Sequence, residues 1–382
     1  MANGYCPSLL AHINSIAECA SPGRKLTPAG LIKMLLGFQN STASLINSGF
    51  DNATGHTRTL TVKYRERPLS SQIQDSEDCE VDVVPVWKEW SLPGLSYREF
   101  SFFLEDTEIQ KYCSEASGTV SAGRPASQFM TEHFDYFVTA ANAILKSINS
   151  ALVTAMATKF GTNVTINSAD GKVINISKDA DEFALDDGLI AILQDLRENE
   201  ICEDLAIVGG GLYSNFDLSR IARCCNAAGF DMGRLSVPTF YFDKETQPIW
   251  GQNSIGVFSQ GSAKMLNRNR YVGAFAGQKG NSFFFTMPLP VSEYCCLDSN
   301  LSNLVFDVQM RYLDCPQTIT IDGSPTAVGR GWQVIVSKYF GLWVLPDDAY
   351  QSGDDLEGTN GTLKYFIQNE SSNTGGAYAY AP

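Results

Sequence analysis

The chain has 382 residues, of which 44% are hydrophobic and 18% are charged. This length and apolar content exclude a largely disordered chain and allow one elaborate domain or two or three connected subdomains. The formal net charge of −14, from 28 Lys and Arg against 42 Asp and Glu, argues against direct binding of nucleic acid, because each phosphate contact needs a cation.

The start of the chain, Met1 to Cys6, lacks a basic region followed by an apolar run, and no stretch approaches the roughly 20 apolar residues of a membrane-spanning helix. We therefore expect a soluble chain that is not secreted. Ten cysteines are present without any C-x-x-C pair. This pattern favours reduced, mostly buried thiols over disulfides or a zinc site.

The first fifty residues predict a loose arm that contains one short helix. Thr27 to Gly30 supplies the start, with Pro28 near the first helical position. Four apolar residues then follow at helical spacing: Leu31, Met34, Leu35 and Phe38. The rest of this arm is rich in Ser, Asn and Gly, and we expect it to lie over another surface.

Two extended runs then predict a long β-hairpin. Residues 59–65 alternate, with Leu60, Val62 and Tyr64 on one face. The second run, 81–90, contains a proline that restricts it to a sheet edge, and an acidic connector forms the tip. The hairpin has too few apolar residues to fold alone. Its tryptophans, Trp87 and Trp90, are expected either to pack on the chain's own body or to reach a neighbouring subunit.

Residues 126–160 predict a long helix, because an apolar stripe from Phe129 to Met156 advances by threes and fours and Gly161 supplies a stop. At 1.5 Å per residue it would be on the order of 50 Å long. A break near 147–150 stays an alternative. His133 lies on the stripe and is interpreted as a packed core residue rather than a ligand.

A mixed region follows the long helix. Residues 164–166 and 173–176 flank Asp170-Gly171, which predicts a hairpin, and a helix is expected around 189–196. A strand over 205–208 then leads through the three glycines 209–211 to a helix over 216–229. This unit imitates a phosphate-binding turn, but its spacing matches neither G-x-G-x-x-G nor G-x-x-x-x-G-K-[ST]. We interpret the glycines as needed for a tight turn and close packing.

No local pattern indicates catalysis or metal binding. Three histidines occur without His-x-x-x-His spacing, and no Gly-x-Ser-x-Gly motif is present. Asp347-Asp348 and Asp354-Asp355 lack the pattern of a calcium loop and are interpreted as solvated loops. A two-carboxylate hydrolase site leaves no local signature and stays open. We expect no catalytic residue, cofactor or metal.

The last third predicts strands separated by Gly, Pro and Asp. They are expected over 303–312, 318–321, 331–337, 342–345 and 363–367. The tail from Asn369 onward is predicted to be flexible or bound to a neighbour.

In this order the parts resemble the major capsid protein of tailed bacteriophages, whose fold is shared with encapsulins. The resemblance rests on the hairpin over 57–90, the helix over 126–160, the segment LAIVGGGLYSNFDLSRIARCCNAAGF, and the strands NLVFDVQMRYLDC and GWQVIVSKYFGLWVLP. It implies an α+β, capsid-type fold with an N-terminal arm, a long extended β-hairpin, a spine helix with a peripheral β-sheet, and a central α/β axial subdomain. The implied divisions are an arm (1–56), an extended hairpin loop (57–110), a peripheral subdomain with the spine helix (111–178), an axial α/β subdomain (179–290), returning strands of the peripheral subdomain (291–368) and a tail (369–382).

The resemblance also implies a function. The chain would be a structural major capsid protein, not an enzyme, that assembles with itself into hexamers and pentamers of an icosahedral phage head. That head would enclose double-stranded DNA without sequence-specific binding, and portal, scaffold or decoration proteins would be partners. The chain would reside in the virion, and in the host cytoplasm during assembly. The alternatives are another virion component, such as a decoration or tail protein, and a soluble hydrolase.

The resemblance implies that the hairpin lies across an adjacent subunit. Its candidate interface residues are Tyr64, Arg65, Arg67, Trp87 and Trp90.

Overall fold

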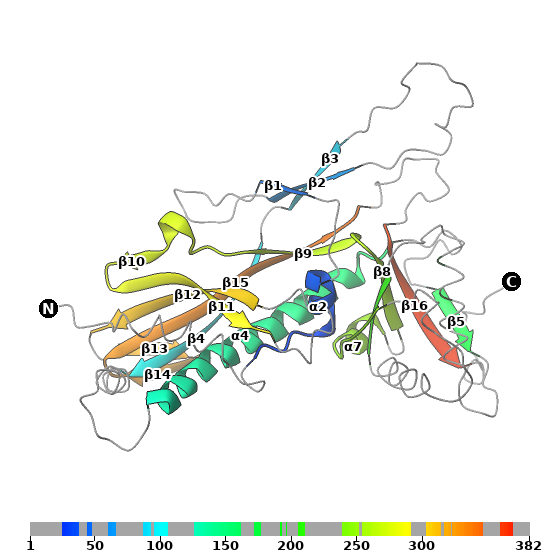
Figure 1. The fold of residues 1–382 in the computed structure, drawn as a ribbon. Coiled ribbons are helices and arrows are strands. Elements are labelled where there is room, and N and C mark those ends of the chain that lie inside the picture. The colour runs from blue at the N-terminus through cyan, green and yellow to red at the C-terminus, as the bar shows by residue number, and fades with distance from the viewer. Residues whose placement is uncertain are drawn as a thin grey trace, which may run out of the picture. The chain divides into compact units, whose positions relative to one another are not determined.

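The chain folds as two compact units, each assembled from three separate stretches. The structure, a computed structural model, describes residues 25–37, 44–47, 60–65, 87–92, 95–105, 126–161, 172–176, 192, 196, 205–210, 239–251, 254–291, 303–314, 317–321, 323–346 and 360–369. The first unit takes Met1–Pro28, Leu95–Ile148 and Asn267–Phe340, and the second takes Ala29–Gly94, Asn149–Leu266 and Gly341–Pro382. Figure 1 shows helices and several sheets, so the predicted α+β class is confirmed.

The first unit is built on an antiparallel sheet with strand order β10-β11-β12-β15-β4. The bounds of these strands are Gly277–Lys279 for β10, Ser282–Pro290 for β11, Asn303–Leu313 for β12, Gly331–Val344 for β15 and Ser96–Glu105 for β4. β9 (Ala263–Arg268) also pairs with β15, and a short 3-10 helix, η4, covers Gly273–Phe275. The predicted strand over 303–312 is confirmed as β12.

One face of this sheet forms the core of the first unit. Leu304, Phe306, Val308 and Met310 alternate along β12 and are all buried. From β4, Phe102 reaches Phe137 of the helix α4 (Ala126–Ala157), with ring centroids 5.3 Å apart in an edge-to-face arrangement. The period-two pattern of the strand and the apolar stripe of the helix therefore meet on one surface.

The long helix is confirmed and is continuous. α4 runs without interruption from Ala126 to Ala157, so the alternative of a break near 147–150 is wrong. A serine inside a helix costs only a few tenths of a kcal/mol relative to alanine. The burial of the α4 residues before and after Ser147 and Ser150 outweighs this cost. His133 lies in this helix, but its side chain is outside the described part.

The strands predicted over 331–337 and 342–345 form one strand. β15 runs through Lys338 and Gly341 from Gly331 to Val344. Lys338, which lies between the two predicted runs, is buried at 2% exposure. A polar residue inside a strand therefore did not mark its end here.

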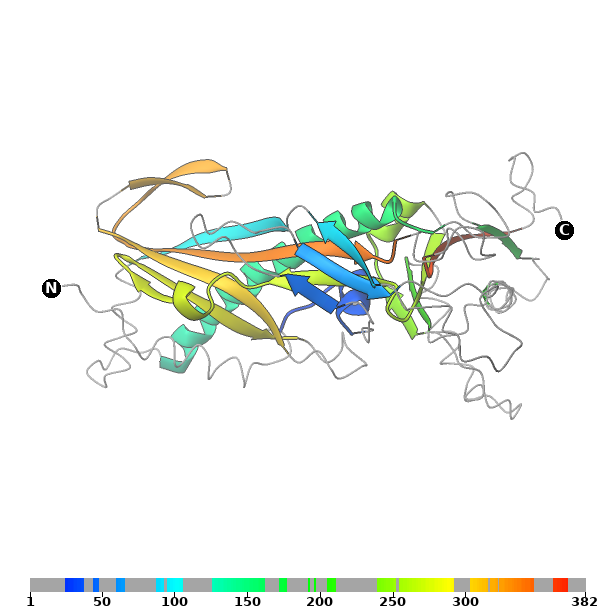
Figure 2. The same cartoon turned by 90° about the horizontal axis from the view of Figure 1, so that it is seen from above.

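β13 (Gln317–Ile321) and β14 (Ser324–Val328) form a two-stranded ribbon. Along the chain this ribbon comes after β12 and before β15. Gly323 makes its turn with a φ of +78°, in the left-handed region that favours glycine. Neither strand pairs with any other described strand, and Figure 2 shows the ribbon standing apart from the larger sheet of its unit. The predicted strand over 318–321 is confirmed as β13.

The second unit contains a mixed sheet with strand order β5-β16-β8-β6-β7. The bounds are Lys172–Ile176 for β5, Thr362–Asn369 for β16, Ser254–Ser259 for β8, Leu205–Gly209 for β6 and Thr239–Phe242 for β7. β16 pairs with β5 and β6 with β7 in parallel, while β8 runs antiparallel to both of its neighbours. The predicted strands over 173–176, 205–208 and 363–367 are confirmed, whereas 164–166 and 216–229 lie outside the described residues.

Asp243 connects four segments of the second unit. Its carboxylate accepts hydrogen bonds from the Leu31 N–H (3.0 Å), the Asn149 side-chain amide (3.1 Å) and the Glu245 N–H (3.0 Å). Its own N–H donates to the Gly209 carbonyl at the end of β6. One of the first N–H groups of the short helix α2 (Gly30–Gly37) thereby obtains an acceptor that the helix itself cannot supply.

The close fit of α2 predicts opposite effects for two glycines of that helix. A Cβ on Gly30 would overlap the backbone carbonyl of Phe242, whereas a Cβ on Gly37 would meet nothing within 4 Å. Alanine gains up to about 1 kcal/mol of helix propensity, but overpacking against backbone costs about 1–3 kcal/mol. We expect Gly30→Ala to lower the free energy of unfolding by about 2 kcal/mol in urea titrations.

Gly37→Ala is the matched control, because it makes the same chemical change without the steric overlap. It is expected to leave stability unchanged or raise it by about 0.5 kcal/mol. Equal effects of the two substitutions would contradict the packing of α2 on β7.

Candidate interaction surface on the hairpin

The hairpin predicted from the two extended runs is present in the second unit. β2 (Leu60–Arg65) pairs antiparallel with β3 (Trp87–Leu92), from Leu60 opposite Leu92 to Arg65 opposite Trp87. β1 (Ser44–Asn47) pairs with the other side of β2, so β3 is an edge strand, as the proline in the second run indicated. The predicted strand over 59–65 is thus confirmed, and β3 covers the end of the run predicted over 81–90.

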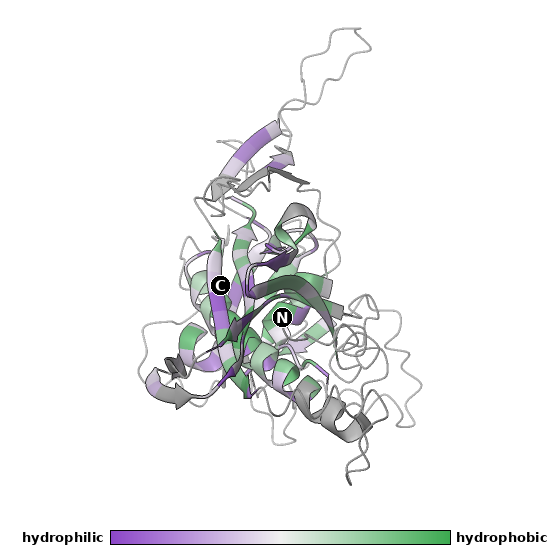
Figure 3. Cartoon of the chain, turned by 90° about the vertical axis from the view of Figure 1, so that its left-hand side faces the viewer, coloured by the Kyte–Doolittle hydropathy of each residue, from purple (hydrophilic) through white to green (hydrophobic). Residues whose placement is uncertain are grey.

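The two faces of the hairpin differ in character. Alternation places Tyr64, Trp90 and Val62 on one face, and Lys63, Glu89 and Trp87 on the other. Tyr64 is only 4% exposed, so its face is covered by the chain itself. Figure 3 shows hydrophilic residues on these strands, in keeping with the charged outer face. Here the outer face means Lys63, Glu89 and Trp87.

The charged pair on the outer face is a cross-strand contact of small energy. Lys63 Nζ lies 3.5 Å from a Glu89 carboxylate oxygen, and the two residues are direct cross-strand partners. Their side chains are 39% and 57% exposed. An exposed pair of this kind contributes about 0.2–1 kcal/mol, which salt screens further.

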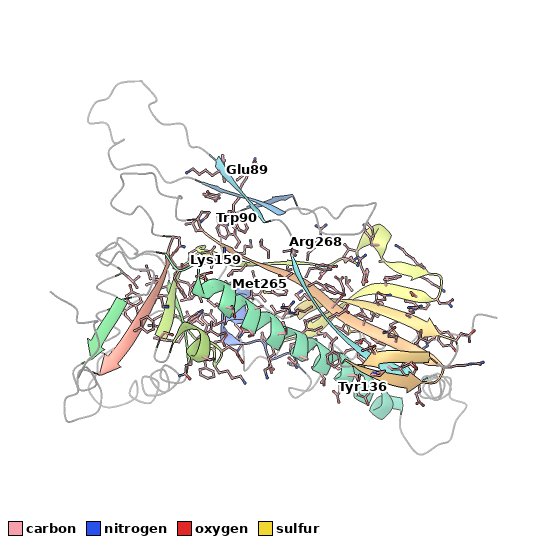
Figure 4. All side chains as sticks on the ribbon, turned by 180° about the vertical axis from the view of Figure 1, so that it is seen from behind. Glu89, Trp90, Tyr136, Lys159, Met265 and Arg268 are labelled. Carbon is pink, nitrogen blue, oxygen red and sulfur yellow. The ribbon has the colours of Figure 1, made fainter. Side chains whose placement is uncertain are left out.

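The two tryptophans of the hairpin have different environments. Trp90 lies against Lys159, two residues beyond the end of α4, with the ammonium nitrogen 5.8 Å from the ring centroid (Figure 4). Trp87, on the opposite face, is 51% exposed. Of the two alternatives from the sequence, Trp90 therefore packs on its own chain, while Trp87 is available to another molecule.

The remaining interface candidates are placed as follows. Tyr64 is buried on the inner face, and Arg65 stands opposite Trp87 in the backbone register. The side chain of Arg65 and all of Arg67 lie outside the described residues. Their role at an interface stays a prediction.

Two aromatic residues that are more than half exposed were not anticipated from the sequence. Tyr136 of α4 is 52% exposed, and Phe242 at the end of the edge strand β7 is 53% exposed. Tyr136 immediately precedes Phe137 and so falls off the apolar stripe, which is a signal that could have identified it. Phe242 belongs to the run Thr-Phe-Tyr-Phe, which a period-two pattern does not distinguish from a buried strand.

The glycine-rich turn after β6 is explained by packing as far as it is described. A Cβ on Gly210 would overlap the side chain of Gln247, which lies in α7 (Thr246–Trp250). α7 is itself anchored where the Trp250 indole N–H donates to the Val153 carbonyl at 2.8 Å. Gly210 thus leaves room for the Gln247 side chain, which agrees with the packing interpretation.

The buried carboxylates of the described residues are engaged by backbone groups. Burial raises the pKa of Asp307, but its two oxygens accept hydrogen bonds from the N–H groups of Arg270 (2.7 Å) and Tyr271 (3.1 Å). The Asp243 carboxylate likewise accepts hydrogen bonds from backbone N–H groups, and also from the Asn149 side-chain amide. In the described part of the chain, no group of three or more His, Cys, Asp and Glu side chains is arranged to hold a metal ion.

Among the helices that the structure describes, none has the length and apolar character needed to cross a membrane.

Comparison with known proteins gives similarity in structure alone. No protein-family model matches the sequence, and no curated protein matches it. A structure from Mycobacterium phage Adephagia superposes with a TM-score of 0.46 at 13% identity, covering 97% of this chain and 95% of that one. The cyanophage A-1(L) capsid asymmetric unit gives 0.43 at 13% identity, over 89% and 93% of the two chains. A virus-like particle from Pyrococcus furiosus gives 0.39 at 10% identity, over 95% and 100%. These scores are too low to carry properties of those proteins over to this chain.

Proposed function

We propose that this chain is a structural coat protein that assembles from many copies into the icosahedral head of a tailed bacteriophage. The observation that carries the proposal is the outer face of the hairpin, where an edge strand presents Trp87 with half of its surface exposed. Tryptophan is enriched at protein interfaces, because its ring system can be buried against a partner while its N–H stays hydrogen-bonded.

The number of separate exposed aromatic residues also supports assembly. Trp87 of β3, Tyr136 of α4 and Phe242 of β7 are each more than half exposed, and they belong to three different elements. A subunit that closes into a ring and then into a shell needs several different contact surfaces, because its ring contacts are heterologous. Hexamers and pentamers built through such contacts are the expected assemblies.

The charge of the chain supports enclosure of DNA rather than binding to it. With a net charge of −14 the protein repels phosphate groups on average, and the salt-dependent affinity that basic DNA-binding proteins gain is not available to it. In this proposal the protein is not an enzyme, and its partners are further copies of itself and the portal, scaffold or decoration proteins of the same virion. It would work in the virion and, during assembly, in the host cytoplasm.

The order of the parts agrees with the resemblance stated from the sequence. Hairpin, spine helix, mixed sheet and returning strands follow one another as β2–β3, α4, β6–β8 and β12–β15. In the proposed assembly the hairpin of 57–110 lies across an adjacent subunit. The segment 179–290 forms the axial subdomain, and the segments 111–178 and 291–368 form the peripheral one.

Substitution of each hairpin tryptophan separates assembly from folding. We expect Trp87→Ala to retain the stability of the parent protein but to assemble poorly, because a central interface tryptophan contributes about 2–4 kcal/mol per contact. Trp90→Ala is expected to lose about 1 kcal/mol of stability from its contact with Lys159. Thermal unfolding of the monomer and electron microscopy of the assembled material measure the two effects.

Trp90→Ala is the matched control, since it removes the same side chain from the opposite face of the same strand. If Trp87→Ala assembled fully into particles like those of the parent, the outer face would not be a major contact between subunits. The shell would then have to be built through other surfaces.

A further inference from the structure

The two-stranded ribbon of β13 and β14 has outer edges that pair with no other described strand. Its register runs from Gln317 opposite Val328 to Ile321 opposite Ser324 without a shift or bulge. Figure 2 shows the ribbon apart from the larger sheet of the first unit. Because a two-stranded ribbon by itself is only marginally stable in water, a further strand on one edge would stabilise it.

The register determines which backbone groups of the ribbon face outward. Thr320 stands opposite Pro325, and proline has no N–H to donate, so this pair is one of the non-hydrogen-bonded pairs of the ladder. Since the two kinds of pair alternate, Thr318 opposite Ala327 is the next non-hydrogen-bonded pair. The N–H and C=O groups of Thr318 and Thr320 therefore point away from β14, and both threonines are exposed.

The two edges of the ribbon differ in their capacity to accept another strand. The edge of β14 contains the exposed Pro325, and proline protects an edge because it cannot donate a ladder bond. The edge of β13 carries neither a proline nor a charge over Gln317–Ile321. Among the described strands of the same unit, the edge strands β10 and β4 of the larger sheet carry the charged residues Lys279 and Arg98. β13 is therefore an edge that is open to strand addition.

The sequence of β13 is complementary to a second copy of itself. When two copies of Gln-Thr-Ile-Thr-Ile run antiparallel about Ile319, Thr318 of each copy stands opposite Thr320 of the other. Both of these pairs join residues whose backbone groups face outward, so all four N–H···O bonds between them can form. Cross-strand threonine pairs are also favourable.

Other two-fold registers lose some of these bonds. A register centred on Thr318 brings Pro316, which has no N–H, opposite Thr320. A register centred on Thr320 would need pairing beyond Ile321, where β13 ends. The register about Ile319 is therefore the one that uses the edge most completely.

The charges near β13 are also compatible with a second copy. Asp322, the residue after β13, is matched in this register by Pro316, the residue before it, so no like charges meet. The net charge of −14 disfavours contact between copies on average. An uncharged strand edge avoids this repulsion.

We propose that β13 is a docking edge for β13 of a second copy of this chain, paired antiparallel about Ile319 so that two ribbons share one four-stranded sheet. Such a contact is isologous, because both copies contribute the same residues. An edge of five residues is small beside the roughly 1,200 Å² of a stable interface, so the pair is expected to be weak between isolated chains. The proposal does not depend on the coat-protein function, because a two-fold pair needs neither a ring nor a shell.

Disulfide trapping with Ile319→Cys in the full chain tests the pairing, because a covalent bond captures a weak contact. In the proposed register the two substituted positions form a non-hydrogen-bonded pair with Cα atoms about 4.5 Å apart, which a disulfide can span. After mild oxidation of soluble and of assembled material, we expect mass spectrometry to find position 319 of one copy linked to position 319 of another. The parent chain, with its ten cysteines, measures the background.

Thr326→Cys is the matched control, because Thr326 stands opposite Ile319 in the same ribbon. In the shared sheet, positions 326 of the two copies are separated by three strand spacings, about 14 Å, which no disulfide spans. We therefore expect no cross-link between them.

Two proline substitutions, each added to Ile319→Cys, assign the cross-link to one edge. Thr320→Pro removes one outward N–H from each copy, and with it two of the four bonds, while the ribbon keeps its own ladder. We expect the yield of the cross-link to fall about tenfold. Ala327→Pro makes the same change on the outer edge of β14 and is expected to leave the yield unchanged.

Absence of the 319–319 link from both soluble and assembled material would overturn the proposal, as would equal cross-linking of Ile319→Cys and Thr326→Cys. Hydrogen exchange of the unmodified chain gives a readout that needs no variant: residues 317–321 are expected to gain protection on assembly or at high concentration, whereas 324–328 are not. Electron microscopy of the same samples separates the two proposals. Shells without the link contradict the strand pairing alone, and linked pairs that form no shell count against the coat function alone.

Discussion

Replacing Asp243 with alanine is expected to lower the free energy of unfolding of the second unit by about 4 kcal/mol. The carboxylate is 1% exposed and accepts hydrogen bonds from Leu31, Asn149 and Glu245. Without it these donors lose their acceptor in a region closed to water, and an unsatisfied buried donor costs about 1–3 kcal/mol. The α2 helix also loses the negative charge at its N-terminus.

Urea titration of Asp243→Ala against Asp314→Ala measures this effect. Asp314 is exposed, so its removal is expected to change stability by no more than about 0.5 kcal/mol. Asp243→Asn keeps the shape and one acceptor oxygen, and is expected to fall between alanine and the parent. A loss for Asp243→Ala as small as that for Asp314→Ala would show that Asp243 does not connect these segments.

Truncating Phe137 is expected to cost the first unit about 3–5 kcal/mol. The ring is 1% exposed and meets Phe102 of β4 edge to face, so alanine leaves a cavity between the helix and the sheet. Tyr136, its neighbour in α4, is 52% exposed and provides a control with a ring of similar size.

Tyr136→Ala is expected to cost less than about 1 kcal/mol, since its ring is half exposed and its contact with Phe102 is a tilted one at 5.9 Å. Thermal unfolding of the two variants side by side distinguishes them. Equal losses would mean that α4 does not present the face to the sheet that its apolar stripe indicates.

The elements that the sequence predicts correctly are those whose burial is periodic. α4 has a stripe that advances by threes and fours, and β2 and β12 alternate between buried and outward positions. In each case only one face is buried, so the spacing of the apolar residues shows which face that is. The hairpin could be predicted as well, because its two runs are close in the sequence and pair with each other.

The features that the sequence does not predict depend on partners that are distant along the chain. Lys338 lies in the gap between two predicted strands, yet it is buried, and its ammonium group donates to the Val305 carbonyl and lies over the Phe306 ring. Asp243 follows an aromatic strand without any recognisable motif, and its donors come from α2, α4 and the residue preceding α7. Tertiary contacts of this kind leave no local pattern.

The candidate interface shows the same difference between features set by local patterns and features set by contacts distant along the chain. Alternation alone places Trp87 and Trp90 on opposite faces of β3, because they are three residues apart. The contact that covers Trp90 comes from Lys159, two residues beyond the end of α4 and far along the chain. The sequence could therefore identify the hairpin as a candidate interface, but it could not say which tryptophan is available.

The central claim, assembly into a shell, is tested most directly by expressing the unmodified chain alone and examining it by size-exclusion chromatography and negative-stain electron microscopy, first alone and then with the scaffold and portal proteins of its virion. We predict closed shells, tubes or ring-shaped hexamers and pentamers. A chain that stays monomeric even with those proteins present would contradict the coat-protein account.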